Sequence, residues 1–344
     1  MFGKNSKILI IGAGAIGGIT AGFLSKGGYN VQIVDKNPDI VERIKSKELH
    51  IYGKKGDFKI SIPALSSIDQ ISEKKDLILL ATKATAMPFV VKDLIPILKE
   101  NSVVVSLQNG ICEEIIAEII GIEATIGCVV GWGATMNSPG ELEMTSTGEF
   151  VIGRIDNKED KRLDSIKEIL QTIVPTDTSN NILGNLYSKL IISSCITTLG
   201  AICGLYLGEM LAIKKIRNIF ICIVREAIDV ANALNITVEP YANKLNYYSF
   251  LKGKGFLANL KRHTLIRLIG YKYKKVKSSS LQSLERGELT EIDYFNGYIF
   301  KKGQQNNVKT PLNECLTNIV KEIEVGKRKI ALSNFDEPFF NQYE

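Results

Sequence analysis

The chain has 344 residues, of which 45% are hydrophobic and 23% are charged, and its formal net charge at pH 7 is +6. These proportions exclude a disordered chain, and the length exceeds what one hydrophobic core usually organises, so two domains are expected. The excess of positive charge gathers between Lys252 and Lys277 instead of spreading along the chain. Because the positive charge is confined to one segment, the sequence argues against a nucleic-acid-binding surface that extends over the whole protein.

The six cysteines stand singly in apolar stretches, without a CxxC pair, and the chain has only two histidines. This pattern predicts reduced thiols in a cytoplasmic protein and no metal site. The N-terminal apolar run leads directly into a glycine pattern, so no cleavable signal is expected. One apolar stretch, residues 191–213, is long enough for a membrane span, but Glu209 and several hydroxyl residues interrupt it. We predict a buried helix pair there and no span.

The first half of the chain alternates short β-branched runs with segments of helical period, which predicts a parallel sheet covered by helices. The predicted strands are 7–11, 31–34, 77–81 and 103–107, and the predicted helices are 15–26, 39–47 and 88–100. Between residues 124 and 155, short runs alternate with Pro-Gly and Thr-Gly turns. We expect further strands there that extend the sheet.

The second half has no strand pattern after residue 180, and the apolar-periodic segments 185–211, 214–234, 288–304 and 313–327 predict helices. The expected fold class is α/β, with an N-terminal Rossmann-type, mostly parallel sheet domain followed by an all-helical C-terminal domain. The expected domains are residues 1–178 and residues 179–344, and the second carries a basic insertion near 247–277. A homodimer formed through the helical domain stays open, since no sequence feature proves it.

A GxGxxG pattern lies between the first predicted strand and the first predicted helix. Its residues are Gly12, Ala13, Gly14, Ala15, Ile16 and Gly17. The first glycine allows a tight turn, the second lets the main chain approach a pyrophosphate, and the third lets the helix pack close to the strand. Free N–H groups at the positive end of the helix then favour phosphate, so a dinucleotide cofactor is expected.

Two residues at the end of the second predicted strand bear on which dinucleotide binds. Asp35 could accept hydrogen bonds from the ribose hydroxyls of the adenosine and repel a 2′-phosphate, which favours NADH. Lys36 follows directly and could instead neutralise a 2′-phosphate, which keeps NADPH open. Lys83 and Asn109 follow the third and fourth strands, at the sheet edge where folds of this class place their ligands, and are further candidates for cofactor binding.

Four segments together resemble the ketopantoate reductase (2-dehydropantoate 2-reductase) family, over nearly the full length of the chain. They are GAGAIG at 12–17, Lys83-Ala84, QNG at 108–110 and TEIDYFNG at 290–297, with YSKL at 187–190 in support. The resemblance implies NAD(P)H-dependent reduction of a small 2-oxo acid, with ketopantoate converted to pantoate in pantothenate and coenzyme A biosynthesis as the first expectation. Residues 1–178 would then bind NAD(P), and residues 179–344 would bind the substrate and serve for dimerisation.

The resemblance also implies roles for single residues. Lys189 matches the general acid that protonates the new hydroxyl, and Glu291 matches the acid that contacts the substrate hydroxyl and positions that lysine. Ser279 matches a substrate-binding hydroxyl. Asn109 would contact the nicotinamide side of the site and the substrate, and Lys83 would bind cofactor or the end of the substrate.

The chain departs from the family pattern at the substrate. Ser193 and Thr197 stand where the family usually carries two asparagines that bind the substrate's hydroxyl and carboxylate, and Ser283 replaces a frequent acid. Hydroxyls reach less far than amides and cannot present paired donors and acceptors. Two alternatives follow: a reductase of a different 2-oxo acid, and a non-catalytic NAD(P)-binding sensor.

The segment 247–277 is longer and more basic than the family's usual connection. Its leucines alternate with Lys261, Arg262 and Arg267, as in an amphipathic helix pair, and we interpret it as a lid over a cleft. A basic helix on a membrane surface, a nucleic-acid patch and a solvated face are the alternatives.

Overall fold

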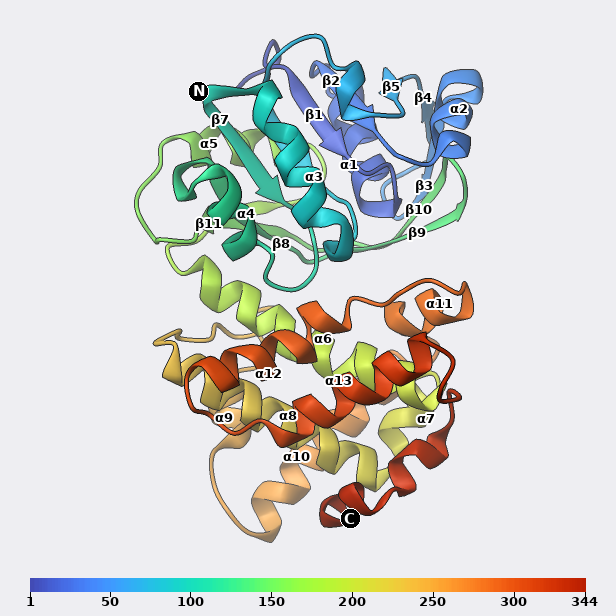
Figure 1. Cartoon of the computed structure of the whole chain (residues 1–344), viewed down its shortest axis with the longest axis vertical. Coiled ribbons are helices and arrows are strands. Elements are labelled where there is room, and N and C mark those ends of the chain that lie inside the picture. The colour runs from blue at the N-terminus through green and yellow to red at the C-terminus, as the bar shows by residue number, and fades with distance from the viewer. The chain divides into compact units, whose positions relative to one another are not determined.

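The computed structural model describes all 344 residues and divides into two compact units, Met1–Leu186 and Tyr187–Glu344. We call them the N-terminal unit and the C-terminal unit, and Figure 1 shows both. The N-terminal unit contains two β-sheets and their helices, and the C-terminal unit is built from helices. The expected fold class is confirmed.

An eight-stranded sheet forms the centre of the N-terminal unit, in the order β12-β11-β8-β7-β6-β1-β2-β5. Its strands are β1 (Ile8–Ile11), β2 (Val31–Val34), β5 (Ala64–Leu65), β6 (Lys75–Leu80), β7 (Leu98–Ser106), β8 (Thr125–Val130), β11 (Phe150–Arg154) and β12 (Thr176–Thr178). Six strands run parallel, and only the pairing of β11 with β8 is antiparallel. Strand β1 lies between β2 and β6, so the order of the chain reverses beside it, which in this class of fold marks the ligand crevice.

The N-terminal unit has five α-helices. They are α1 (Ala15–Lys26), α2 (Pro38–Lys47), α3 (Met87–Leu94), α4 (Glu113–Ile120) and α5 (Arg162–Leu170), with 3-10 turns η1 (Ile68–Gln70), η2 (Ala84–Ala86), η3 (Ile95–Ile97) and η4 (Ile122–Ala124). The predicted helix 88–100 is too long, because α3 ends at Leu94 and strand β7 begins at Leu98. Pro96 lies in η3 between them, and a proline there offers no N–H to continue the helix.

A second, four-stranded sheet was not predicted. Its order is β4-β3-β10-β9, with β3 (Leu49–Gly53), β4 (Phe58–Ile60), β9 (Gly133–Ser138) and β10 (Glu141–Ser146). Only β8 and β11 of the segment 124–155 extend the main sheet as expected. The second sheet packs on α1 where the helix lacks side chains: a Cβ on Gly18 would lie 2.3 Å from Leu142, and one on Gly22 would lie 2.0 Å from Ile51. Distant strands meet here, since β10 pairs in parallel with β3.

The C-terminal unit is helical, as predicted. Its elements are α6 (Ile182–Cys203), α7 (Leu207–Ala212), α8 (Lys214–Ala233), α9 (Tyr247–Leu251), α10 (Phe256–Lys272), α11 (Ser279–Glu285), α12 (Asn296–Gln305) and α13 (Pro311–Glu324), with η5 (Ile292–Tyr294), η6 (Leu332–Asp336) and η7 (Pro338–Tyr343). Helix α6 is continuous across the junction between the two units.

Two predicted helices begin or end at the wrong residues. The segment 185–211 is broken, because Gly204 adopts φ +73° and ends α6 before α7 begins. The segment 288–304 becomes the short turn η5 and then α12, which begins only at Asn296. In the basic segment we expected a pair of amphipathic helices. The structure has instead one short helix, α9 with five residues, and one long helix, α10 with 17 residues.

Helix α6 is long and apolar enough to cross a membrane by length and composition. Its most apolar window is 78% buried inside the protein, and the core helix of a globular protein passes the same test. The stretch 191–213, which raised the question in the sequence, consists of the end of α6, a turn and α7.

Candidate active site

The glycine-rich turn lies at the carboxyl edge of the main sheet, between the ends of β1 and β6. Gly12 has φ +99°, and a Cβ on it would lie 2.9 Å from the backbone of Ala81. Its N–H donates to the carbonyl of Val34 at 2.7 Å, which joins the turn to the end of β2. A side chain at this position would strain the backbone at this positive φ and would also clash with the backbone of Ala81, so only glycine fits.

The other two glycines of the pattern face different surroundings. A Cβ on Gly17 would lie 1.9 Å from the carbonyl oxygen of Gly12, so α1 can approach β1 this closely only with glycine. Around Gly14, the residue that precedes α1, no atom lies within 4 Å of such a Cβ. The turn is therefore packed from inside at Gly17 and open at Gly14, over the N-terminus of the helix. That opening fits a dinucleotide pyrophosphate.

Asp35 belongs to the same turn. Its Oδ2 accepts the N–H of Ala13 at 2.6 Å, and its Oδ1 accepts the N–H of Asn37 at 2.8 Å. The carboxylate thus holds the glycine-rich turn and the start of α2 in place, while each oxygen keeps a lone pair for a further donor. Lys36 is exposed beside it. Both residues lie where the sequence placed them, at the end of β2.

Lys83 and Asn109 lie in neighbouring loops at the same edge, because β6 and β7 are parallel and adjacent. A residue that sequence reasoning quoted without assigning a role connects these loops. The buried amide of Gln108 donates to the carbonyl and hydroxyl oxygens of Thr82, at 3.0 and 3.1 Å, and weakly to the carbonyl of Lys83. Lys83 is exposed and Asn109 is half-buried. The first half of the predicted site is thus assembled along one edge.

Glu113, the first residue of α4, is a second residue that sequence reasoning missed. Its side chain is fully buried behind the Gln108 loop, with its Cγ 3.5 Å from the position of a Cβ on Gly127 in β8. Burial raises the pKa of the Glu113 carboxyl to about 7, and the Ser106 hydroxyl and nearby backbone groups offset this only in part. Neither carboxylate oxygen makes a hydrogen bond of regular geometry. The sequence EEIIAEII of α4 contains three glutamates, and nothing in it marks Glu113 as the buried one.

In the C-terminal unit, Lys189, Ser193 and Thr197 lie on one face of α6, since they recur every four residues. All three are half-buried, while most residues of this helix are buried. The helix is held next to Lys189 by the buried Tyr247, whose hydroxyl donates to the carbonyl of Ser188 at 2.7 Å. These three residues form the polar stripe of α6.

The hydroxyls of this stripe are not equivalent. Thr197 donates its hydroxyl hydrogen to the carbonyl of Ser193, one turn earlier, at 2.8 Å. In this rotamer the Thr197 oxygen presents acceptor lone pairs and has no hydrogen left for a carboxylate. The expectation that both hydroxyls donate to a substrate carboxylate therefore requires Thr197 to rotate.

Ser279 is exposed at the first position of α11. The preceding Ser278 caps that helix and donates to the carbonyl of Thr197 at 3.2 Å. Gly200 makes the approach possible, because a Cβ there would lie 2.7 Å from the Ser278 hydroxyl oxygen. Ser278 therefore joins the start of α11, which carries Ser279, to the far end of the polar stripe. The substrate-binding role of Ser279 stays a prediction.

Glu291 lies half-buried directly before η5, in a segment that α13 and α6 hold. The preceding Thr290 donates its N–H and hydroxyl to Glu324 of α13, at 2.7 and 2.6 Å. Further on, Asn296 accepts the Thr198 hydroxyl of α6 at 2.5 Å. The segment of Glu291 is therefore tied to the helix that carries Lys189.

The Asn296 contact is part of a buried polar network that sequence reasoning also missed. Asn296 donates to Asn313 at 2.9 Å, and Asn313 donates to Glu226 of α8 at 2.6 Å. Glu226 also accepts the N–H groups of Leu312 and Asn313, at 3.0 Å each, so it caps α13. Burial raises the pKa of Glu226. The network connects α6, α8, α12 and α13, and its signal was the asparagine of TEIDYFNG.

Both units match known protein families. Residues 8–157 match the family described as "Ketopantoate reductase PanE/ApbA", and residues 181–324 match "Ketopantoate reductase PanE/ApbA C terminal". The 2-dehydropantoate 2-reductase of Pyrococcus horikoshii is 30% identical over 322 residues, which cover 92% of this chain and 97% of that protein. The chain belongs to the ketopantoate reductase family.

Two solved structures are similar to this ketopantoate reductase family member. A PanE/ApbA family ketopantoate reductase from Ralstonia eutropha JMP134 has a TM-score of 0.80 and 25% identity, and covers 94% of this chain and 99% of its own. A D-mandelate dehydrogenase, solved with NADH and anilino(oxo)acetate, has a TM-score of 0.79 at 22% identity, covering 93% and 99%. The second likeness concerns the fold alone. Family membership makes the chain an NAD(P)-dependent oxidoreductase that acts on a small 2-oxo acid.

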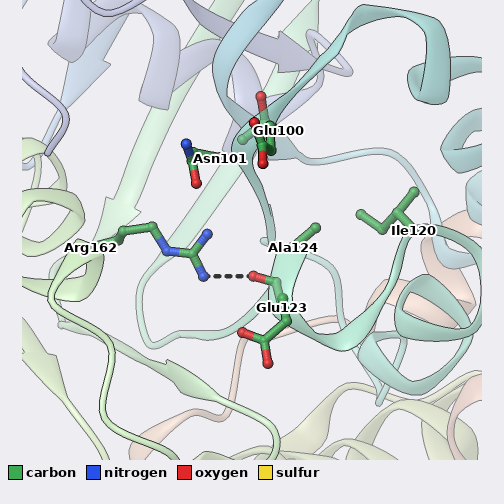
Figure 2. Close-up of a pocket in the computed structure, with 7 residues that line it drawn as sticks. Glu100, Asn101, Ile120, Glu123, Ala124 and Arg162 are labelled. Atoms are coloured by element: carbon green, nitrogen blue, oxygen red, sulfur yellow. Dashed lines mark hydrogen bonds between the residues drawn. The ribbon is translucent and has the colours of Figure 1, made fainter.

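The N-terminal unit of this family member also has a cavity of about 350 Å³, shown in Figure 2. It lies at the opposite edge of the main sheet, since its lining comes from the start of β7 and the turn before β8. Arg162 in its wall donates to the carbonyl of Glu123 at 2.6 Å and also pairs with Asp160. None of the predicted site residues lines this cavity.

Proposed function

We propose that the chain reduces ketopantoate to pantoate with NAD(P)H, in pantothenate and coenzyme A biosynthesis. The observation that carries this proposal is the glycine-rich turn, closed at Gly17 and open at Gly14, at the carboxyl edge where β1 lies between β2 and β6. Its likeness to the 2-dehydropantoate 2-reductase of P. horikoshii supports the choice of substrate.

The N-terminal unit would hold the cofactor. The backbone around Gly12, Gly14 and Ala15 would bind the pyrophosphate at the start of α1, and Asp35 would accept the ribose hydroxyls. Asn109 would contact the nicotinamide side and Lys83 the cofactor or the end of the substrate, with Gln108 holding their loops together. When bound, the reduced nicotinamide supplies the hydride.

The C-terminal unit would hold the substrate and supply the proton. Lys189 donates a proton from Nζ to the carbonyl oxygen, which becomes the hydroxyl oxygen of the 2-hydroxy acid. Glu291 accepts a hydrogen bond from the substrate hydroxyl and positions Lys189. Ser193, Thr197 and Ser279 bind the polar end of the substrate. The anchoring of Thr290 to Glu324, and of Asn296 to Thr198, keeps these groups in place before the substrate arrives.

The cofactor preference we propose is NADH. Asp35 is fixed by two N–H donors, so its charge cannot move away from an adenosine 2′-phosphate. Lys36 is exposed beside it and could still neutralise such a phosphate, which makes NADPH the alternative.

A second candidate substrate is a bulkier or less charged 2-oxo acid. The observation in its favour is the hydrogen bond from Thr197 to the carbonyl of Ser193, because it removes a donor from the place where the family carries an asparagine. A substrate that needs fewer hydrogen-bond donors at that end would lose less binding free energy than ketopantoate.

We further propose the domain roles stated for the sequence: residues 1–178 bind NAD(P), and residues 179–344 bind the substrate and pair two copies in a homodimer. A cytoplasmic location agrees with six cysteines that are thiols and not disulfides.

The test is the loss of NADH or NADPH absorbance with ketopantoate, in separate reactions of the purified chain at neutral pH. Turnover supports the proposed activity, and the larger kcat/KM identifies the cofactor. If the cofactor binds but ketopantoate is not reduced, the proposal fails. A panel of 2-oxo acids of increasing bulk then tests the second candidate.

A further inference from the structure

The basic segment contains a charge pattern unlike the rest of the chain. Residues 240–284 include ten of the 43 lysines and arginines and none of the 37 acidic residues. The remainder of the chain is therefore net negative, and the positive charge of the whole protein comes from this one stretch. At its centre is α10, which Figure 1 shows in the C-terminal unit.

The inner face of α10 is firmly attached. Ile266 and Gly270 are buried, and a Cβ on Gly270 would lie 2.9 Å from Leu211 of α7. The buried guanidinium of Arg262 donates to the carbonyls of Phe250, Leu251 and Gly253 at 2.7 to 2.8 Å. These contacts hold the helix and the preceding loop on the C-terminal unit, so the opposite face has a defined orientation.

The outer face of α10 is apolar as well. Leu257, Leu260, Leu268 and Tyr271 recur on one stripe of the helix, with Phe256 at its start. Leu257 is 78% exposed, Leu268 60% and Tyr271 75%. A helix that is apolar on both faces is normally covered on both faces. We call these five side chains the apolar stripe of α10.

Exposed basic residues border the apolar stripe. Lys261 and Lys272 lie along one side of it and Arg267 along the other, by their positions on the helix. Two tyrosines lie near the end of the helix, with the Lys274 ammonium 5.7 Å from the ring centre of Tyr271 and the Lys272 ammonium 5.2 Å from that of Tyr273. The surface thus combines leucines at its centre, cations at its rim and tyrosines at one end.

We propose that the apolar stripe of α10 and its basic rim bind the surface of an anionic lipid bilayer. Leucines would enter the boundary between headgroups and acyl chains, and the lysines and arginines would meet the lipid phosphates. Tyrosines favour that same interfacial depth.

Two other occupants fit less well. A second copy joined through the same face would place one basic rim against another, with no acidic residue in 240–284 to offset the repulsion. A nucleic acid would use the cations but leave a row of leucines without apolar contacts, because its affinity comes from phosphates. A bilayer uses both parts of the surface.

The experiment is sedimentation of the purified full chain with vesicles of equal parts phosphatidylglycerol and phosphatidylcholine, and with vesicles of phosphatidylcholine alone. The chain is expected to sediment with the anionic vesicles, and the bound fraction should fall as salt is added. Leu257→Gln combined with Leu268→Gln should lower the partition coefficient at least tenfold. Lys261→Gln combined with Lys272→Gln should lower it for anionic vesicles and flatten its dependence on salt.

The matched control is Ile95→Gln combined with Val325→Gln, two exposed aliphatic residues outside the basic segment, which should bind vesicles like the unaltered chain. An unchanged thermal unfolding temperature establishes that each variant is folded. The proposal is overturned if the unaltered chain stays in the supernatant with anionic vesicles, or if the folded leucine variant binds as well as the control. A mobility shift of duplex DNA without vesicle binding, or self-association that the leucine variant abolishes, would also overturn it.

Discussion

The glycine-rich turn after β1 and the polar stripe of α6 teach different lessons, although both are short runs of small or polar residues. In the turn, the function of each glycine follows from the backbone itself: Gly17 has no room for a Cβ, and Gly14 has open space. In the stripe, the same hydroxyl can donate or accept, and the Thr197 hydroxyl is used by the helix. Backbone geometry leaves one role per residue, whereas a side-chain hydroxyl takes its role from its neighbours.

The largest effect is expected at the polar stripe. Lys189→Ala should lower kcat by about 10²–10⁴-fold, because a positioned proton donor contributes that much to a transition state. The dissociation constant of the cofactor, measured by fluorescence titration, should stay the same. Lys301→Ala, an exposed lysine on α12, is the control. A Lys189→Ala enzyme with nearly full kcat would remove this residue from its proposed role.

The second prediction concerns the buried acid behind the Gln108 loop. Because the Glu113 pKa is raised from 4.5 to about 7, the folded protein keeps a proton that the unfolded chain releases in this range. The free energy of unfolding should therefore fall as pH rises through this window, by about 3 kcal/mol in all, and level off above it. Glu113→Gln should remove this slope. Urea unfolding of both proteins between pH 5 and pH 8 is the measurement, and parallel curves would contradict it.

Two glycine variants separate packing from binding within the turn. Gly17→Ala should lower the free energy of unfolding by about 2–3 kcal/mol, since the clash with Gly12 outweighs the roughly 1 kcal/mol that alanine gains in a helix. Gly14→Ala should leave unfolding unchanged and weaken cofactor binding. Thermal unfolding without cofactor and titration with it measure the two effects. Equal losses of stability in both variants would show that the turn is not open at Gly14.

A substitution in the stripe tests substrate choice. Ser193→Asn combined with Thr197→Asn introduces two amides in the polar stripe of α6, and it should raise the preference for ketopantoate over a bulkier 2-oxo acid by about tenfold. The ratio of the two kcat/KM values measures this preference. A lower ratio in the variant would mean that the hydroxyls already suit ketopantoate.

The smallest effect is expected at Asp35. Asp35→Asn keeps an oxygen for one of the two N–H donors and removes the charge. The kcat/KM ratio of NADPH to NADH should rise about fivefold, because a unit charge at roughly 4 Å is worth about 1 kcal/mol in water. An unchanged ratio would place the cofactor preference on Lys36 or elsewhere.

Much of the fold could be predicted because it rests on local patterns. The parallel strands that follow β1 are buried on both faces, so each appears as a continuous apolar run, and the long helices of the C-terminal unit show their period. The second sheet could not be predicted, because its strands β3 and β10 are short and lie about 90 residues apart. Their pairing depends on the glycine face of α1, which only the folded chain presents.

The site divides in the same way. The sequence alone determined the glycine-rich turn, the position of Asp35 and the four-residue spacing of Lys189, Ser193 and Thr197, because covalent geometry and helical period set them. Only the tertiary structure decided that Gln108 joins two loops, that Asn296 ties the Glu291 segment to α6, and that Glu113 is buried. It also decided that α10 keeps one apolar face uncovered. Hydrogen-bond partners and burial come from residues far apart in the chain, and no local pattern contains them.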